Sequence, residues 1–417
     1  MLAIFSRIFK HNDIPKEYRS NFLHFYLDIG WFGVLSGSAV NFINVYATRL
    51  GATGFQIGLL GAVSAVVSLL IAIPAGRWIE KHNTGRAVFW SSVIYRFGFL
   101  LWIPLPWLFN NQAQIWALII LTFLMAIPLT PLAVGFSALF AEAIPSDWRA
   151  HVAGIRNIVL SIAFMAASLL SGYLLKNIPF PAGYQIVFGI GALGAAMSSL
   201  HLYFIRSLQS DSHTVQTQPE PDSVKQSISP LNVLRLDIWK THFRNVLLTL
   251  FAYHFAQYLA MPIFPIYNVR ILKLNDGHIG IGTALFYLTV LLSSTQLRKM
   301  VHRIGHKNLT GWSVAGMAAY PLILSMSTEV WHYYAISLIG GLGFAMVSGA
   351  YANYMLEHIP ANDRPSHLAW YNIILNAAIL IGSLAGPAIA DQIGLSQALI
   401  LIAALRFLSG LFILKWG

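Results

Sequence analysis

Glu142-Ala-Ile-Pro-Ser-Asp-Trp-Arg149 recurs as Glu357-His-Ile-Pro-Ala-Asn-Asp-Arg364, 215 positions later in the chain. Earlier in the sequence the offset is 221 positions, and it relates Tyr46 to Tyr267. A spacing of this size is far longer than one supersecondary repeat, so it indicates a duplication of half the chain. The sequence therefore predicts two similar halves.

The composition places both halves in a membrane. Of 417 residues, 57% are hydrophobic and only 10% are charged, whereas soluble proteins carry about 25% charged residues. This composition excludes a soluble multidomain enzyme and a disordered chain. The absence of cysteine excludes disulfide scaffolds, thiolate metal sites and thiol nucleophiles.

The apolar residues form runs long enough to cross a bilayer, which takes about 20 residues per helix. The runs do not alternate, so helices are expected and not the strands of a barrel. Twelve spans are predicted, at 20–46, 55–76, 87–108, 113–140, 151–174, 183–205, 244–267, 278–297, 309–326, 331–356, 367–390 and 395–414.

Basic residues identify the cytoplasmic side. When the connections alternate between two sides, nineteen of the 26 Lys and Arg residues fall on one side. Because basic residues accumulate in cytoplasmic loops, both termini are expected in the cytoplasm and the protein in the cytoplasmic membrane. The net charge of +11 then reports topology, and no nucleic-acid partner is expected.

Four regions are predicted along the chain. Residues 1–19 form a cytoplasmic, amphipathic N-terminus, and 20–206 form the first six-helix bundle. Residues 207–243 are a polar cytoplasmic linker that ends in a helix on the membrane surface, at 231–243. Residues 244–417 form the second bundle.

Short loop motifs strengthen this interpretation. Gly76, Glu80, Gly85 and Arg86 follow the second span, Arg303 and Gly305 stand at the matching place in the second half, and Pro145-x-x-x-Arg149 recurs as Pro360-x-x-x-Arg364. With twelve spans and the duplication, the chain resembles the major facilitator superfamily over nearly its whole length. The resemblance implies an all-α fold of two pseudo-symmetric six-helix bundles.

The same resemblance implies alternating access. Spans one, four, seven and ten would line the cavity, and spans two, five, eight and eleven would form the contact between the halves. Signatures of the drug and sugar subfamilies are absent, and Gly386-Pro387 lies in the eleventh span, not the fifth. The resemblance therefore leaves the solute open.

Ionisable groups inside spans are functional candidates, because burying a charge in the bilayer is costly. They are Asp28, Arg96, Arg156 and Arg406. Asp28 either forms an ion pair with Arg96 or Arg156 inside the first half, or faces the pathway and carries protons.

Polar residues at helical spacing suggest the pathway. Asn157, Ser161 and Ser168 correspond to Asn372, Asn376 and Ser383, and each trio shares one helix face. Such faces suit either helix packing or a solute pathway. His254 is either a proton carrier or a hydrogen-bond donor to a neighbouring helix. The complete set of pathway candidates is Asn41, Asn44, Asn157, Ser161, His254, Gln257, Tyr258, Tyr351, Asn353, Asn372 and Asn376.

The cytoplasmic loop charges either form a gate or only fix the orientation. Glu80, Glu142 and Glu357, together with Arg149 and Arg364, are the gate candidates. His302 and His306 have a spacing that can bind metal, but no further ligand accompanies them, so a loop role without metal is expected.

Transport of a small solute, with or without protons, is the favoured function. No phosphate-binding loop is present, so ATP is not expected to drive it, and neither a cofactor nor an enzymatic activity is expected. The alternative is a receptor or scaffold that keeps the fold without transport. The protein is expected to act as a monomer in the lipid bilayer.

Overall fold

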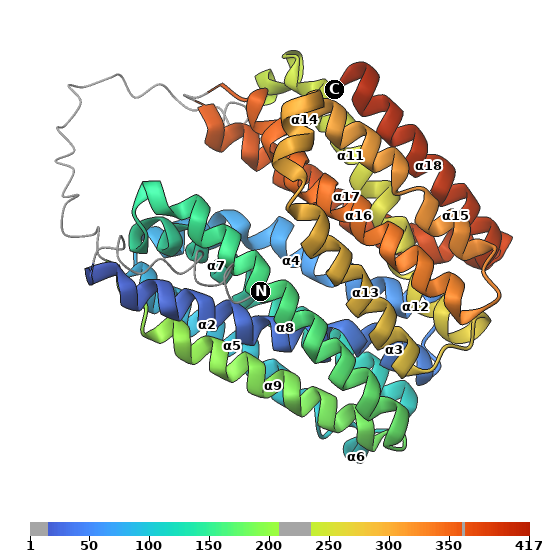
Figure 1. The fold of residues 1–417 in the computed structure, drawn as a ribbon. Helices are drawn as coiled ribbons and strands as arrows, with labels where there is room; N and C mark the ends of the chain where they lie inside the picture. Colours follow the sequence, from blue (N-terminus) through green and yellow to red (C-terminus); the bar gives the residue numbers. More distant parts are fainter. Residues whose placement is uncertain (1–15, 208–234, 361–362) are drawn as a thin grey trace, which may run out of the picture. The chain divides into compact units, whose positions relative to one another are not determined.

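The computed structural model describes residues 16–207, 235–360 and 363–417. Every regular element in these ranges is helical, which confirms the predicted all-α class (Figure 1). Most of the predicted amphipathic N-terminus at 1–19, namely residues 1–15, lies outside the described residues, as does most of the polar linker.

The elements alternate long helices with short 3-10 or π segments. Those of the first half are η1 (Lys16–Tyr18), α2 (Arg19–Leu35), η2 (Ser36–Val40), α3 (Asn41–Arg49), α4 (Gly54–Glu80), α5 (Thr84–Phe97), η3 (Gly98–Trp102), α6 (Leu105–Leu108), α7 (Asn111–Ala143), α8 (Ser146–Asn177) and α9 (Ala182–Tyr203). Those of the second half are η4 (Leu236–Lys240), α11 (Phe243–Ala260), α12 (Ile263–Ile266), η5 (Tyr267–Ile271), α13 (Asp276–Ser294), α14 (Leu297–Gly316), α15 (Ala319–Ser325), α16 (Val330–Glu357), α17 (Arg364–Ile393) and α18 (Leu395–Trp416).

Nine helical segments among the described residues are long and apolar enough to cross a bilayer, and one of them, Phe243–Ile271, combines α11, α12 and η5. The other three predicted spans, 20–46, 87–108 and 309–326, consist of shorter consecutive elements. In the first of them the helix passes through the π segment η2. In the third it breaks between α14 and α15, close to Pro321, which has no N–H for the helical ladder.

The predicted surface helix at 231–243 is wrong in extent. Within its described part, the five residues of η4 form a 3-10 turn, and Phe243 already begins α11. Arg235, directly before η4, has a φ of 47°. Because a left-handed residue cannot continue a right-handed helix, a regular helix cannot run through this position.

The chain forms two compact units, which are described separately. Of the described residues, unit 1 comprises 16–51, 70–207 and 275–287, and unit 2 comprises the others. Each unit thus draws mainly on one half of the sequence, with one exception in each direction. The first part of α13 packs in unit 1, and the first part of α4, up to residue 69, packs in unit 2.

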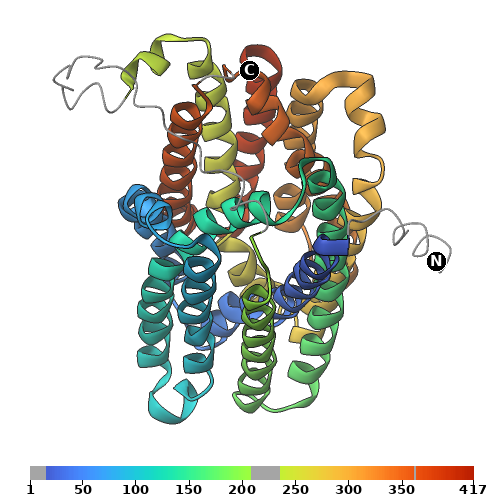
Figure 2. The same cartoon turned by 90° about the vertical axis from the view of Figure 1, so that its left-hand side faces the viewer.

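Unit 1 is built around α2, which packs against α8 and α9, while α5 packs against α7 and α9. Figure 2 shows α5 and α7 as an antiparallel hairpin closed by α6. Phe22, Phe25, Val88, Leu139 and Val152 are buried in the core of this unit. These apolar side chains come from four helices and fix the positions of the polar groups described below.

Unit 2 has a comparable arrangement. Helix α11 packs against α17 and α18, and α14 packs against α16 and α18 (Figure 1). Its core contains Val246, Leu250, Val314, Val347 and Ile413. The same scheme of packed apolar helices thus supports the polar side chains of each unit.

Candidate functional site

An aromatic cluster in unit 2 joins side chains from α11, α16 and α17. His254 of α11 is buried, and its Nε2 lies 3.1 Å from the hydroxyl of Tyr371 on α17. Tyr351 of α16 meets the His254 ring edge-on, with centroids 5.8 Å apart, and lies 6.4 Å from the Tyr371 ring. The structure therefore brings the predicted residues His254 and Tyr351 together around Tyr371.

Gln257 and Tyr258 follow His254 in the next turn of α11. The amide nitrogen of Gln257 contacts the sulfur of Met261 at 3.8 Å. Its Oε1 atom is buried without a hydrogen-bond partner among the described residues. An unpaired buried acceptor is costly, so Gln257 Oε1 is suited to receive a hydrogen bond from a bound solute.

Tyr371 was missed by the sequence reasoning, which favoured its neighbour Asn372. Asn372 is exposed, whereas Tyr371 is only 6% exposed. Asn376 donates to the backbone carbonyl of Asn372 at 2.9 Å, a local bond within α17. The repeat thus identified the correct helix, but the buried side chain is one residue away from the position that follows the repeat.

A charged cluster lies inside unit 1. Arg156 Nη1 is 3.2 Å from Asp28 Oδ2, and Arg96 Nη2 is 3.7 Å from Asp28 Oδ1. Ser198 donates to Asp28 Oδ1 at 2.5 Å. The three charged side chains are each less than a tenth exposed. Asp28 therefore forms the ion pair that was one of its two predicted roles, and it does so with both arginines.

The guanidinium groups of the spans differ in their surroundings. Arg156 also lies over the rings of Phe25 and Phe136, at 5.2 and 4.9 Å, where cation–π attraction helps to hold it. Arg406 in α18 is 1% exposed and donates only to backbone carbonyls, at 3.3 Å to Met317 and 3.5 Å to Ala256. The ion pairs of the described residues do not include Arg406.

The predicted polar face of α8 makes contacts with its neighbours in unit 1. Asn41 Nδ2 donates to Ser168 Oγ at 3.3 Å, and Ser161 donates to the carbonyl of Asn157 in its own helix. Asn157 is exposed. Asn44 Oδ1 is buried without a hydrogen-bond partner among the described residues. On this face of α8, Ser168 therefore contacts a neighbouring helix, whereas Asn157 is exposed.

Glycines allow close helix contact at two related positions. A Cβ on Gly280 of α13 would lie 2.6 Å from the Ser168 carbonyl of α8, in unit 1. A Cβ on Gly58 of α4 would lie 2.3 Å from the Ser383 carbonyl of α17, in unit 2. Since Ser168 and Ser383 are 215 positions apart, both units use the same device for close approach.

Arg49 forms an ion pair that the sequence did not indicate. Its Nη2 lies 2.9 Å from Asp276 Oδ1 at the start of α13, and Tyr184 donates to the same oxygen at 2.9 Å. In unit 2 the related Arg270 donates to the carbonyl of Ala52, just before α4. Arg49 thus contacts the first residue of α13, and Arg270 contacts the segment just before α4.

The predicted gate residues Glu142 and Arg149 hold a loop of unit 1. Glu142 accepts hydrogen bonds from Thr84 at 3.0 Å and from Ser207 at 2.8 Å. Arg149 donates to the carbonyls of Ala141 and Ile144, at the C-terminal end of α7, where a cation is favourable. These bonds join the ends of α5, α7 and α8 to the segment after α9.

The remaining motif residues lie at helix ends or at a helix kink. Gly76 and Glu80 belong to the last turns of α4, and Gly85 and Arg86 belong to the first turn of α5. Helix α5 begins after Asn83, whose side chain accepts a hydrogen bond from the Arg86 amide. Arg303 lies in the first part of α14, and Gly305, with a non-helical φ of 78°, forms the kink between the two parts of this helix.

A second set of loop charges fixes the described end of the linker in unit 2. Arg235 lies 3.0 Å from Asp237 and 2.8 Å from Asp363, just before α17. The hydrogen bond from Arg235 holds the pKa of Asp237 below its usual value. Hydrogen bonds from Ser366 and from Arg235 lower the pKa of Asp363. Both carboxylates therefore remain charged at neutral pH.

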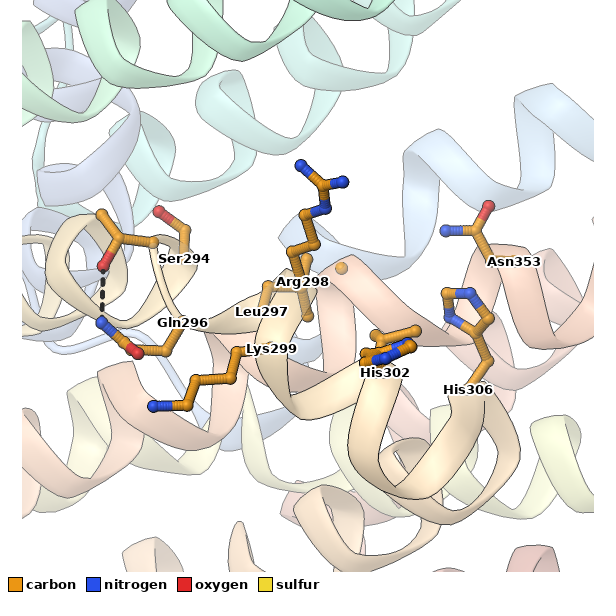
Figure 3. A pocket seen from close by; sticks show the side chains of 11 residues that line it. Ser294, Gln296, Leu297, Arg298, Lys299, His302, His306 and Asn353 are labelled. Atoms are coloured by element: carbon orange, nitrogen blue, oxygen red, sulfur yellow. Dashed lines mark hydrogen bonds between the residues drawn. The ribbon is translucent and has the colours of Figure 1, made fainter.

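Unit 2 also contains a large open pocket of about 900 Å³. It lies between the end of α13, the start of α14 and α16, and Figure 3 shows its side chains. The polar groups among its lining residues are Ser294, Thr295, Gln296, Arg298, Lys299, His302, His306 and Asn353. None of the lining residues is acidic. Of the predicted pathway candidates, only Asn353 lines this pocket.

Comparison with known proteins identifies the family. The model of the Major Facilitator Superfamily matches residues 27–253 and 246–417. The staphyloferrin B transporter of Staphylococcus aureus is 26% identical over 184 residues, which are 43% of this chain and 44% of that protein. The quinolone resistance protein NorA of Staphylococcus aureus is 21% identical over 377 residues, which are 89% of this chain and 88% of that protein.

Solved structures agree with this assignment at the level of the fold. The nucleoside transporter NupG has a TM-score of 0.66 at 12% identity, with 96% of this chain and 99% of that chain covered. A bacterial homologue of the iron transporter ferroportin, in an inward-facing state, has a TM-score of 0.69 at 14% identity, with 96% and 98% covered. The match to the staphyloferrin B transporter spans less than half of that protein, but the family model extends over nearly the whole chain, which is a multi-pass membrane protein of the major facilitator superfamily.

Proposed function

We propose that this protein carries a small solute across the cytoplasmic membrane by alternating access. The observation that supports this proposal best is the cluster of His254, Tyr351 and Tyr371, with the unpaired acceptor of Gln257 one turn away. Polar groups among aromatic rings on packed helices are typical of small-molecule sites. Both termini are proposed to lie in the cytoplasm.

The cluster defines the kind of solute that it would bind. Tyrosine and histidine rings offer flat apolar surface and hydrogen-bonding edges, and Gln257 Oε1 offers an acceptor. A solute with a flat apolar part and at least one N–H or O–H donor matches these groups. We assign His254 a binding role and not proton transfer, because its described polar partner is a phenol and not a carboxylate.

Solute binding is expected to depend on His254 and Tyr371. His254→Phe and Tyr371→Phe keep aromatic rings but remove the hydrogen bond between them, so the affinity should fall about tenfold, the equivalent of about 1.4 kcal/mol. The measurement is the thermal stabilisation of the purified protein by a quinolone, a tetracycline and a nucleoside, since bound solutes raise apparent stability. Tyr173→Phe, at a tyrosine that is 65% exposed, is the control. Equal stabilisation of all variants would contradict the assigned site.

Transport itself separates the proposal from its alternative. Any solute that stabilises the protein should cross vesicles that contain the protein faster than protein-free vesicles. Stabilisation without faster flux would instead favour a receptor that keeps the fold. Flux that ignores an imposed pH gradient would exclude coupling to protons.

Arg49 and Asp276 are proposed to keep the non-cytoplasmic side closed. The chain has no cysteine, so Asn44→Cys gives a single labelling site next to the predicted pathway. With Arg49→Gln or Asp276→Asn, labelling by a membrane-impermeant maleimide from outside should become about tenfold faster, because a charge-assisted hydrogen bond is lost. The swap Arg49→Asp with Asp276→Arg should restore slow labelling.

The control for this experiment is Lys176→Gln, which removes an exposed cation from the same predicted side. If Lys176→Gln accelerates labelling as much as Arg49→Gln does, general electrostatics and not the ion pair control access. Glu80, Glu142 and Arg149 are proposed as the corresponding cytoplasmic gate, together with Arg303, Glu357 and Arg364.

A further inference from the structure

The pocket between α13, α14 and α16 has an unbalanced positive charge. Arg298, Lys299, His302 and His306 line it, and no lining residue is acidic. The nearest carboxylate with a described contact is Glu357, whose Oε1 lies 3.9 Å from His306 Nε2. Glu357 can balance only His306, so Arg298 and Lys299 leave a local excess of positive potential, which attracts anions.

The start of α14 adds to this excess. Its first turn contains two cations and no acidic residue, and the N-cap Gln296 makes no side-chain cap hydrogen bond. Cations near a helix N-terminus are unfavourable, because the first N–H groups already form the positive end of the helix dipole. Without an anion, Arg298 and Lys299 repel this positive helix end and destabilise the protein. An anion bound beside them would relieve this repulsion.

The side chains are arranged around one side of the pocket. In Figure 3, Arg298, His306 and Asn353 extend from α14 and α16 toward the same region, whereas Lys299 points away from them. The Nδ1 atom of His306 is buried without a hydrogen-bond partner among the described residues. A guanidinium, an unpartnered imidazole nitrogen and an amide thus line the same pocket.

We propose that this pocket binds a phosphate group. A guanidinium fork suits phosphate oxygens, which accept two parallel hydrogen bonds from it, and His306 and Asn353 can donate to the remaining oxygens. The volume of about 900 Å³ leaves room for a larger molecule that carries the phosphate. The phosphate can belong to a soluble cytoplasmic compound or to the headgroup of an anionic phospholipid.

The proposal does not depend on the proposed transport function. Tyr351 and Asn353 both lie on α16, but Tyr351 belongs to the aromatic cluster and Asn353 lines the basic pocket. Binding at the pocket is measured directly, without any transported solute. Failure of phosphate binding therefore leaves the assignment of the aromatic cluster untouched.

The first arm of the test uses inorganic pyrophosphate. Purified protein in neutral detergent should be stabilised by pyrophosphate relative to chloride at the same ionic strength. Arg298→Gln and His306→Gln should each weaken this binding about tenfold or more, because each removes a hydrogen bond to a charged group. Lys307→Gln is the matched control, since it removes a cation from the same helix at a position that does not line the pocket.

The second arm distinguishes the source of the phosphate. Nanodiscs of phosphatidylcholine are compared with nanodiscs that contain phosphatidylglycerol, and the wild type is compared with Arg298→Gln. Stabilisation by phosphatidylglycerol that Arg298→Gln abolishes would identify a lipid headgroup, whereas a response to pyrophosphate alone would identify a soluble phosphate compound. Equal responses of wild type, Arg298→Gln and Lys307→Gln in both arms would overturn the proposal, because the charges would then act only as a diffuse field.

Discussion

Asp28→Asn is expected to destabilise the protein by about 3–5 kcal/mol, because it removes the charge that compensates two buried arginines. Asp28 is the carboxylate that contacts both Arg96 and Arg156. Without its charge, two guanidinium groups remain buried inside unit 1, and neither can move to water without unpacking a helix. The free energy of unfolding in mixed micelles with increasing SDS measures the loss.

The same cluster predicts a much smaller effect for the removal of Arg96. The cluster holds one carboxylate and two guanidinium groups, and Arg96 is the more distant of the two, with an unpartnered Nε. Arg96→Met leaves a balanced pair of Asp28 and Arg156, so stability should change by less than about 1 kcal/mol. Ser198→Ala should cost about 1 kcal/mol, as the loss of one hydrogen bond.

The test is the order of these variants in their free energy of unfolding. If Arg96→Met were as damaging as Asp28→Asn, the two arginines would share the carboxylate equally and the argument from excess charge would fail. If Asp28→Asn were harmless, the two arginines would not need the charge of Asp28 as compensation. That result would return the residue to its other predicted role, in proton transfer.

The architecture was predictable because it follows from span length and from a repeat of half the chain. A run of about 20 apolar residues has few alternatives to a membrane helix, and the 215-residue offset identified α8 and α17 as equivalent helices. Three spans were predicted as continuous although the structure divides them, because small local breaks such as η2 hardly change the hydropathy.

The partners of the polar residues were less predictable, because they depend on which helix faces which. Arg49 and Asp276 are 227 positions apart, and no local pattern connects them. Tyr371 has a neighbour, Asn372, that follows the repeat, so the repeat favoured the exposed residue of the pair. The basic pocket was similarly hidden, since His302 and His306 gain their meaning only beside Arg298 and Asn353.

Valine at Gly58 and Gly280 is expected to open the non-cytoplasmic side more strongly than the loss of the Arg49 ion pair. The added Cβ atoms would lie 2.3 Å from the Ser383 carbonyl and 2.6 Å from the Ser168 carbonyl. Both neighbours are helix backbone, which cannot rotate away as a side chain can. The helices must therefore separate along α4 and α17 and along α13 and α8.

The rate at which a reagent reaches an introduced cysteine measures this separation, and the solute need not be known. In the Asn44→Cys background, labelling from outside by an impermeant maleimide should accelerate by more than tenfold in the Gly58→Val and Gly280→Val double variant, since overpacking typically costs about 1–3 kcal/mol at each site. Gly189→Val is the control, because a Cβ on Gly189 meets no atom within 4 Å.

The single variants separate a local disturbance from a change of state. Gly58 contacts α17 in unit 2, whereas Asn44 lies in unit 1, so Gly58→Val affects the label only if the two glycine contacts open together. Equal acceleration by Gly58→Val and by Gly280→Val would support one coupled opening, as alternating access requires. Acceleration by Gly280→Val alone would show that this contact is local packing of α13 on α8. The two glycine contacts would then not open together, which would contradict the prediction.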